Sequence, residues 1–196
     1  MSFVEADVIA QVRRGDGNAF TVLVEAYQRP VYNLCYRMLG NAEDAEDASQ
    51  EAFWRAYQGI GRYDMSRSFI TWLLSIAAHY CIDLQRKRRV PITDIELLPE
   101  ETLPDTIPDP EFAVSQMEED ALLYKLLNGL APVDRAAIIM RYWYSFSEVE
   151  IATALHLSQS AVKSRLFRAR KLLADIWEEN QTEPIAAGET YVSPAF

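Results

Sequence analysis

The chain has few of the residues that build catalytic centres and disulfide frameworks. Its 196 residues include two cysteines, two histidines and seven glycines. Cys35 and Cys81 each lie inside an apolar pattern of helical spacing, which indicates buried reduced thiols rather than a disulfide or a metal knuckle. His79 and Asp83 share a helix face, but two adjacent ligands are one short of a catalytic metal site. Because no nucleophile–base set and no phosphate-binding loop appears either, we expect no enzyme, no cofactor and no metal.

Long apolar runs and a leader-like N-terminus are also missing. No run approaches the roughly 18 residues that a membrane-spanning helix needs. The first residues, MSFVE, lack the charged-then-apolar layout of a signal peptide. We therefore expect a cytoplasmic protein with no membrane insertion. The hydrophobic fraction of 49 % still allows real cores, in one large domain or two small ones.

One long stretch has no positive charge, and this stretch divides the chain. Residues 91–115 hold seven acidic side chains and no basic one, in a chain whose formal net charge is −10. Residues 1–90 and 116–179 are almost balanced. Five prolines between residues 90 and 113 prevent a continuous helix there. We thus expect an N-terminal domain (1–90), an extended acidic linker (91–115), a C-terminal domain (116–179) and a flexible tail (180–196).

Both domains show the apolar spacing of helices, and strand-like alternation is not sustained anywhere. In the N-terminal domain the pattern predicts a helix that ends at Gly40, a new helix capped by Asn41, and a loop over residues 58–68 before a third long helix. In the C-terminal domain it predicts helices over residues 122–130 and 134–142. The predicted fold class is therefore all-α, with two small helical domains.

The second domain is predicted to contain a helix-turn-helix. Ser147 and Glu150 have the spacing of a capping box that opens a short helix ending at Leu155. A break of three residues follows, and its last residue, Ser158, is a suitable N-cap for the next helix. In a helix-turn-helix the second helix enters the major groove of DNA.

That second helix is the most basic part of the chain. Residues 158–173, SQSAVKSRLFRARKLL, hold five cations and no anion. Its apolar side chains share one face, so side chains near its start could reach base edges while the later cations suit phosphates. The predicted DNA-binding residues are Ser160, Lys163, Ser164, Arg165, Phe167, Arg168, Arg170 and Lys171. The alternative is a solvated surface helix whose cations balance nearby acidic groups.

Three blocks, in this order, resemble one protein family. They are residues 41–57 (NAEDAEDASQEAFWRAY), residues 69–89 (FITWLLSIAAHYCIDLQRKRR) and residues 127–173, which include the helix-turn-helix. Together they resemble the two typical regions of extracytoplasmic-function (ECF) sigma factors, the alternative specificity subunits of bacterial RNA polymerase. The resemblance implies that the first domain binds core polymerase and recognises and melts the −10 promoter element. It implies that the second domain, a region 4-like helix-turn-helix domain, recognises the −35 element.

The resemblance also assigns roles to residues of the first, region 2-like domain. In the family the helix matching residues 41–57 docks on the clamp helices of the polymerase, whereas the residues alone favour an ordinary solvated face. The implied polymerase-binding residues are Asp44, Asp47, Gln50, Glu51 and Trp54. The implied −10 residues are Arg62, Tyr63, His79, Arg86, Arg88 and Arg89, which could cradle an unstacked base and hold the DNA backbone. Trp72 lies on the apolar stripe and is expected in the core.

The partners implied by the resemblance are core RNA polymerase, through its clamp helices and flap, promoter DNA, and an anti-sigma factor. The acidic linker resembles the family connector that passes through the polymerase channels later used by RNA. Four residues depart from the usual family pattern, so the promoter sequence stays open. They are His79 for Asn, His156 for Gly, Ser160 for Gly and Ala161 for Thr.

A conventional helix-turn-helix regulator is the alternative function. Residues 1–90 would then be a dimerisation or effector module, and the protein would bind operators as a dimer without polymerase. A sigma factor usually binds promoter DNA well only as part of the holoenzyme. Dependence of DNA binding on core polymerase therefore separates the two hypotheses.

Overall fold

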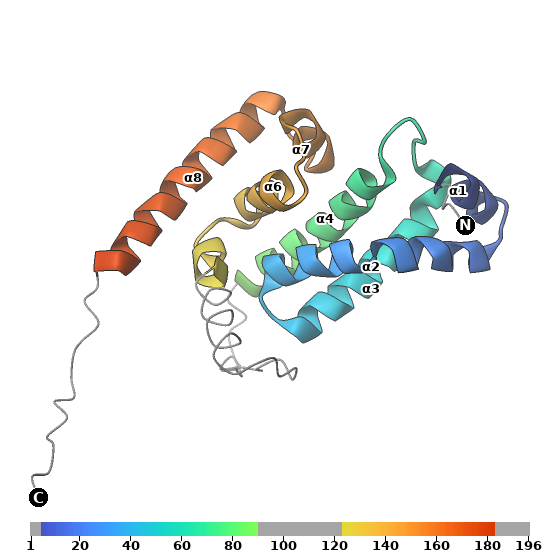
Figure 1. Cartoon of the computed structure of the whole chain (residues 1–196), viewed down its shortest axis with the longest axis horizontal. Coiled ribbons are helices and arrows are strands. Elements are labelled where there is room, and N and C mark those ends of the chain that lie inside the picture. Colours follow the sequence, from blue (N-terminus) through green and yellow to red (C-terminus); the bar gives the residue numbers. More distant parts are fainter. Residues whose placement is uncertain (1–4, 90–122, 183–196) are drawn as a thin grey trace, which may run out of the picture.

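A computed structural model describes residues 5–89 and 123–182 of the chain. The expected acidic linker and the part of the expected tail from residue 183 onward lie outside the described residues. Every regular element within those two ranges is a helix, which confirms the predicted fold class (Figure 1). No helix among them is both long and apolar enough to cross a bilayer.

The first domain consists of four α-helices and a short 3₁₀ turn. They are α1 (Glu5–Arg13), α2 (Gly17–Leu39), α3 (Ala42–Gly59), the turn η1 (Ile60–Arg62) and α4 (Phe69–Arg89). The second domain comprises a helical segment over residues 123–128 and three named helices. These are α6 (Pro132–Trp143), α7 (Glu148–Ala154) and α8 (Gln159–Thr182).

The helix boundary at residues 40 and 41 is confirmed in detail. Gly40 ends α2 with a left-handed φ of 75°, which a side chain would strain, and its amide donates to the carbonyl of Tyr36. The side chain of Asn41 then caps α3 by accepting from the amide of Asp44. The predicted loop over residues 58–68 begins later than expected, because α3 continues through Gly59 into η1. Buried Ile60 holds this extra turn in the core.

The core of the first domain lies between α2, α3 and α4. Alanine at four buried positions of α3 lets this helix approach the large apolar side chains of its neighbours. The thiols of Cys35 on α2 and Cys81 on α4 are buried and free, as expected. The hydrogen bond between the two thiols, together with burial, raises the pKa of the Cys81 thiol. It is therefore a packing group, not a reactive thiolate.

In the second domain α8 lies along the outer side of α6 and α7 (Figure 1), and the buried side chains of these helices belong to one apolar cluster with those of the first domain. Met140, Ile151 and Val162 bring one buried side chain from each helix. The predicted capping box is present at the start of α7. There the Ser147 hydroxyl accepts from the Glu150 amide while the Glu150 carboxylate accepts from Ser147, and these hydrogen bonds lower the pKa of Glu150.

The two domains are held together where α2 ends. The last carbonyls of a helix have no partner within the helix, so they need donors from elsewhere. The buried guanidinium of Arg135 on α6 donates through Nη1 to the carbonyl of Met38 (2.6 Å). The Tyr124 hydroxyl donates to the carbonyl of Leu39 (2.8 Å). The side chain of Gln85 on α4 also donates to the Met38 carbonyl, so both domains meet at one atom.

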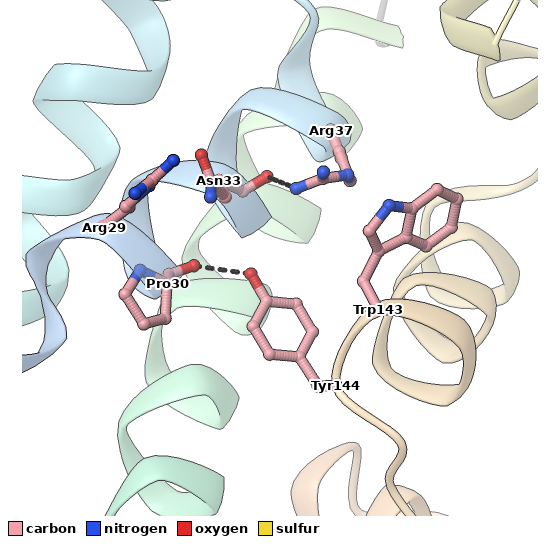
Figure 2. A pocket seen from close by; sticks show the side chains of 6 residues that line it. All are labelled: Arg29, Pro30, Asn33, Arg37, Trp143 and Tyr144. Carbon is pink, nitrogen blue, oxygen red and sulfur yellow. Dashed lines mark hydrogen bonds between the residues drawn. The ribbon is translucent and has the colours of Figure 1, made fainter.

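A second set of contacts joins the middle of α2 to the end of α6 (Figure 2). The Tyr144 hydroxyl donates to the carbonyl of Pro30 (2.6 Å), and burial raises the pKa of Tyr144 to about 12. The Arg37 guanidinium lies 5.1 Å from the ring centroid of Trp143. We call the contacts of this and the preceding paragraph the interdomain seam.

The seam predicts that Arg135 contributes strongly to stability. Arg135→Met keeps the bulk of the side chain but removes its donors to Met38 and Asn128, so we expect the free energy of unfolding to fall by about 2 kcal/mol. Urea unfolding followed by circular dichroism measures this. The control is Arg170→Met, an exposed site on α8 where a change within about 0.5 kcal/mol is expected. Equal losses in the two variants would contradict the role of Arg135.

Candidate nucleic-acid interface

The helix-turn-helix has the geometry that the sequence predicts. Residues 155–158 separate α7 from α8, and His156 adopts a left-handed φ of 53° within this turn. The amide of Leu157 donates to the carbonyl of Ala152 (2.9 Å), which closes the turn. The hydroxyl of Ser158 accepts from the Ala161 amide (3.2 Å), so Ser158 is the N-cap of α8.

The solvent-facing side of α8 carries most of the predicted DNA-binding residues. The exposed members are Ser160, Lys163, Ser164, Phe167, Arg168, Arg170 and Lys171. The ring of Phe167, also on this side, is 64 % exposed. Within the described part of the chain, Arg168, Arg170 and Lys171 form no ion pair. These three charges are therefore available to an anion.

Lys163 and Arg165 are held by carboxylates from the neighbouring helices. Lys163 Nζ lies 3.6 Å from Glu148 Oε2 on α7, a long pair in which the lysine is exposed and the glutamate is partly exposed. Arg165 Nη1 lies 2.7 Å from Asp134 Oδ1 on α6, and both side chains are mostly buried. Arg165, predicted as a phosphate contact, thus ties α8 to α6 in this structure. Asp134 was not among the predicted site residues, because nothing local in the sequence links it to a residue so far along the chain.

The predicted polymerase-binding face lies on α3, next to α4. Asp47, Gln50, Glu51 and Trp54 line a shallow hollow of about 500 Å³ together with Tyr80 of α4. The Trp54 side chain is 56 % exposed. An exposed indole beside carboxylates suits a partner that offers both apolar and basic side chains.

Asp44 lies apart from that hollow and is already paired. Its two carboxylate oxygens lie 2.6 and 2.8 Å from the guanidinium nitrogens of Arg88 near the end of α4. The pKa of Arg88 is raised by this hydrogen bonding. The structure therefore joins one predicted polymerase-binding residue to one predicted −10 residue.

The predicted −10 residues differ in how accessible they are. Arg62 and Arg86 are exposed, and the side chain of Arg89 lies outside the described part. The Tyr63 ring is only 5 % exposed, and it packs edge-on against Phe69 with a centroid distance of 5.4 Å. In this arrangement Tyr63 cannot stack on an unpaired base.

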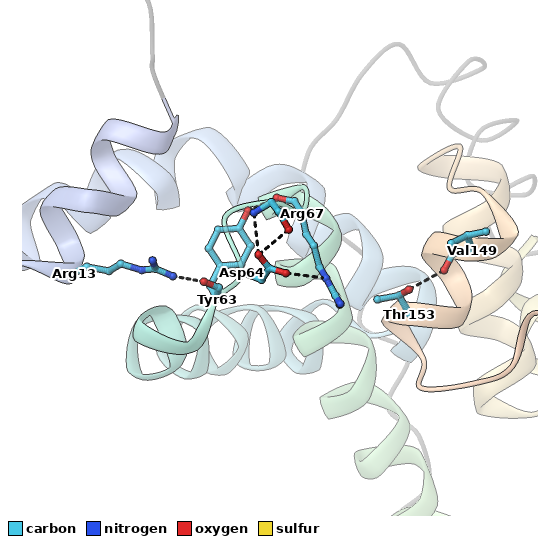
Figure 3. A network of polar contacts seen from close by, with 7 residues as sticks. Arg13, Tyr63, Asp64, Arg67, Val149 and Thr153 are labelled. Atoms are coloured by element: carbon cyan, nitrogen blue, oxygen red, sulfur yellow. Dashed lines mark hydrogen bonds and ion pairs between the residues drawn. The ribbon is translucent and has the colours of Figure 1, made fainter.

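A network of polar contacts fixes the loop around Tyr63 (Figure 3). The Arg13 guanidinium donates to the carbonyls of Ile60 and Tyr63, and the Tyr63 hydroxyl donates to the carbonyl of Arg67. Hydrogen bonds from Ser66 lower the pKa of Asp64 in the same loop. Arg13 gave no signal in the sequence analysis, because its partners are backbone atoms far along the chain.

His79 and Trp72 lie on α4 and are both partly buried. Trp72 packs on the Tyr63 ring at a centroid distance of 5.0 Å, which is consistent with its expected place in the core. His79 Nδ1 lies 2.8 Å from the Ser75 carbonyl. Its ring faces the His156 ring from the helix-turn-helix, with 4.9 Å between centroids. Among the described residues, no group of three or more His, Cys, Asp or Glu could hold a metal ion.

The ion pair between Arg165 and Asp134 predicts a stability effect. Asp134→Asn removes the charge that anchors Arg165, and we expect a loss of about 1 kcal/mol in the free energy of unfolding. A double-mutant cycle with Arg165→Gln isolates the coupling of the two side chains. The exposed pair of Lys163 and Glu148 is the control, with a smaller coupling. Equal coupling in both pairs would show that Arg165 is not an anchor.

Comparison with known proteins gives matches to both domains. Residues 23–90 match the family model of Sigma-70 region 2, and residues 120–173 match that of Sigma-70, region 4. The chain is 38 % identical over 172 residues to the ECF RNA polymerase sigma factor SigW of Bacillus subtilis, covering 84 % of this chain and 92 % of that protein. It is 31 % identical over 176 residues to the RNA polymerase sigma-H factor of Pseudomonas aeruginosa, covering 86 % and 91 %.

Two solved structures are similar in fold. The structure of CnrH in complex with the cytosolic domain of CnrY matches with a TM-score of 0.66 and 24 % identity, over 88 % of this chain and 96 % of that chain. The sigma factor RpoE in complex with the anti-sigma factor NepR from Bartonella quintana matches with a TM-score of 0.58 and 21 % identity, over 81 % and 96 %. The identity to SigW over nearly the whole of both proteins decides the assignment. The chain belongs to the ECF RNA polymerase sigma factors, alternative sigma factors that direct the polymerase to specific promoters.

Proposed function

We propose that this sigma factor divides promoter recognition between its two domains. The C-terminal helix-turn-helix reads the −35 element, and the N-terminal domain binds core polymerase and opens the −10 element. The observation that carries this proposal is the cationic face of α8, which is exposed on a chain of net charge −10. A local positive face can bind DNA although the whole molecule is acidic.

At the −35 element, some side chains of α8 read the DNA sequence and others position the helix on the DNA backbone. Ser160, Lys163 and Ser164 lie in its first turns, where they would reach base edges in the major groove. Lys163 exchanges its exposed contact with Glu148 for DNA, and this exchange costs little because surface ion pairs are weak. Arg168, Arg170 and Lys171 then contact phosphates and fix the orientation of the helix.

The face on α3 binds the clamp helices of core polymerase, and the second domain contacts the flap. Trp54 has the exposure and size of an interface anchor, and Asp47 and Glu51 supply the negative charge around it. Of these, Glu51 already has Arg55 as a partner (2.7 Å), so Asp47 is the freer carboxylate. The factor acts where the polymerase transcribes, in the cytoplasm.

At the −10 element, exposed cations hold the DNA backbone and His79 contacts a base. Arg62 is accessible as it stands, and Arg86 has only a long, exposed contact with Asp83 (3.8 Å), whereas Arg88 must first leave Asp44. Tyr63 takes part only if its loop opens, since its ring is now in the core. The solved complex of RpoE with the anti-sigma factor NepR supports the further proposal that an anti-sigma factor restrains this chain too.

Transcription in vitro with core polymerase tests the division of tasks. On a genomic fragment library, we expect new start sites that share two upstream elements. Asp47→Ala combined with Gln50→Ala should raise the concentration needed for half-maximal initiation about tenfold or more, because the polymerase face is lost. Lys163→Ala combined with Arg168→Ala should abolish start sites while binding to core polymerase is retained. Gln11→Ala, an exposed change on α1, is the control.

Two results would contradict this division of tasks. If no start site depends on core polymerase, and the protein alone protects DNA from cleavage, the chain acts as a helix-turn-helix regulator instead. If Lys163→Ala with Arg168→Ala retains all start sites, α8 does not read the promoter.

Salt dependence separates phosphate contacts from base contacts on α8. Arg168→Ala should reduce the slope of log affinity against log salt concentration by about 1, because one phosphate contact is lost. Ser164→Ala, one helical turn earlier, should leave that slope unchanged and alter the preferred −35 sequence. Holoenzyme binding to a short promoter duplex measures both effects. An unchanged slope for Arg168→Ala would exclude its contact with a phosphate.

A further inference from the structure

A pocket in the interdomain seam is lined by residues of both domains (Figure 2). Its volume is about 260 Å³. The lining residues are Arg29, Pro30, Asn33 and Arg37 of α2, together with Trp143 at the end of α6 and Tyr144 directly after it. The contacts proposed above for α3, α4 and α8 use none of these six residues.

The pocket contains an arginine that is held in place by two neutral groups. Arg37 Nη1 donates to the carbonyl of Asn33 (3.1 Å), and the guanidinium lies 5.1 Å from the ring centroid of Trp143. Because a carbonyl and an indole are neutral, neither contact cancels the positive charge. The side chain is half-buried, which limits the screening of this charge by water. Arg37 keeps further N–H donors for an anion and loses little side-chain freedom when it binds one.

A second arginine contributes to the same pocket. Arg29, Asn33 and Arg37 follow one another at intervals of four residues, so they lie along one side of α2 (Figure 2). Arg29 is exposed, and its long side chain can turn toward a ligand. The rings of Pro30 and Trp143 add apolar walls. The pocket thus combines two guanidinium groups with apolar surface.

We propose that this pocket binds a small phosphate monoester and that the bound ligand joins the two domains. Guanidinium groups donate paired hydrogen bonds to phosphate oxygens. Two of them match the nearly double negative charge of a phosphate monoester better than the single charge of a carboxylate. The apolar walls contact the organic group of the ester. A volume of about 260 Å³ lies below the usual range for drug-sized ligands, so the pocket fits a small metabolite rather than a nucleic-acid strand.

The place of the pocket couples binding to the arrangement of the domains. Both arginines belong to the first domain, and the indole that orients Arg37 belongs to the second. A ligand in this pocket therefore has a higher affinity for packed than for separated domains, and by linkage it favours the packed arrangement. If the domains part to reach two promoter elements, the ligand lowers initiation, a consequence that rests on the proposed function. Binding itself is measured without polymerase or DNA.

Isothermal titration calorimetry of the full chain with phenyl phosphate tests the pocket. We expect one site per chain, and benzoate, which has a similar ring but a single charge, should bind about tenfold more weakly. Arg37→Gln should weaken phenyl phosphate binding about tenfold or more, because charge-assisted hydrogen bonds are lost. A wild-type chain that does not bind phenyl phosphate, or that binds benzoate equally well, would overturn the proposal.

Further variants are needed because Arg37 is itself part of the seam. Arg29→Gln changes an exposed side chain, so the fold is kept while binding should weaken about threefold. Arg14→Gln is the matched control, since it removes an exposed positive charge outside the pocket and should leave the affinity unchanged. Equal losses in these two variants would show a general charge effect and refute the site. A loss in Arg168→Gln but not in Arg29→Gln would place the phosphate on α8 and refute it as well.

One variant of the second domain tests whether the ligand joins the domains. Trp143→Leu keeps an apolar side chain but removes the indole that orients Arg37, so phenyl phosphate binding should weaken about threefold or more. Far-ultraviolet circular dichroism checks that the helices are retained. Full affinity in Trp143→Leu would show that the second domain takes no part in binding and would refute the link between the ligand and domain packing.

Discussion

The arrangement of the two domains depends on the C-terminal end of α2. A helix leaves its last carbonyls without partners, and here the carbonyls of Met38 and Leu39 receive donors from Gln85, Arg135 and Tyr124. Gly40 makes this possible, because its left-handed conformation ends the helix and leaves these carbonyls open to other segments. The side chain of Tyr124 occupies the space where a Cβ at residue 40 would lie. One helix end therefore carries polar contacts from both domains.

The seam differs in kind from the apolar packing, which forms one cluster across both domains and includes the contacts of α4 with α6 and α7. The apolar packing is built from aliphatic and aromatic side chains, whereas the seam is made of hydrogen bonds, a buried guanidinium and a stacked arginine. Burying a guanidinium carries a desolvation cost that hydrogen bonds only partly offset. Polar contacts of this type can be replaced by water when the surfaces part, while exposed apolar cores cannot. If the domains part to make the proposed contacts at two promoter elements, the polar groups of the seam can bond to water instead.

The sequence predicts local features well. The cap residues Gly40, Asn41, Ser147 and Ser158 all act where the pattern places them, because capping depends on neighbours within about four residues. The exposed face of α8 also follows from its periodicity. The burial of Tyr63 could not be predicted in this way, because its ring is enclosed by Phe69 and held through Arg13 from another helix. A loop of polar and glycine residues gives no sign of an aromatic side chain directed inward.

For the same reason, the sequence could not predict that several site residues are already paired with other residues of the chain. Asp44 with Arg88, Asp134 with Arg165 and His79 with His156 each join residues that are distant in sequence, so composition and spacing could not show them. If these residues bind DNA or polymerase as proposed, each must exchange its internal partner for the new one. Where the internal pair is exposed, as for Lys163 and Glu148, the exchange is easy, since water already screens the charges. Where it is mostly buried, as for Arg165, the internal partner is retained and the side chain keeps the helix in place. In the proposed complex, the degree of burial thus separates the α8 cations that would turn to DNA from Arg165, which holds the helix that presents them.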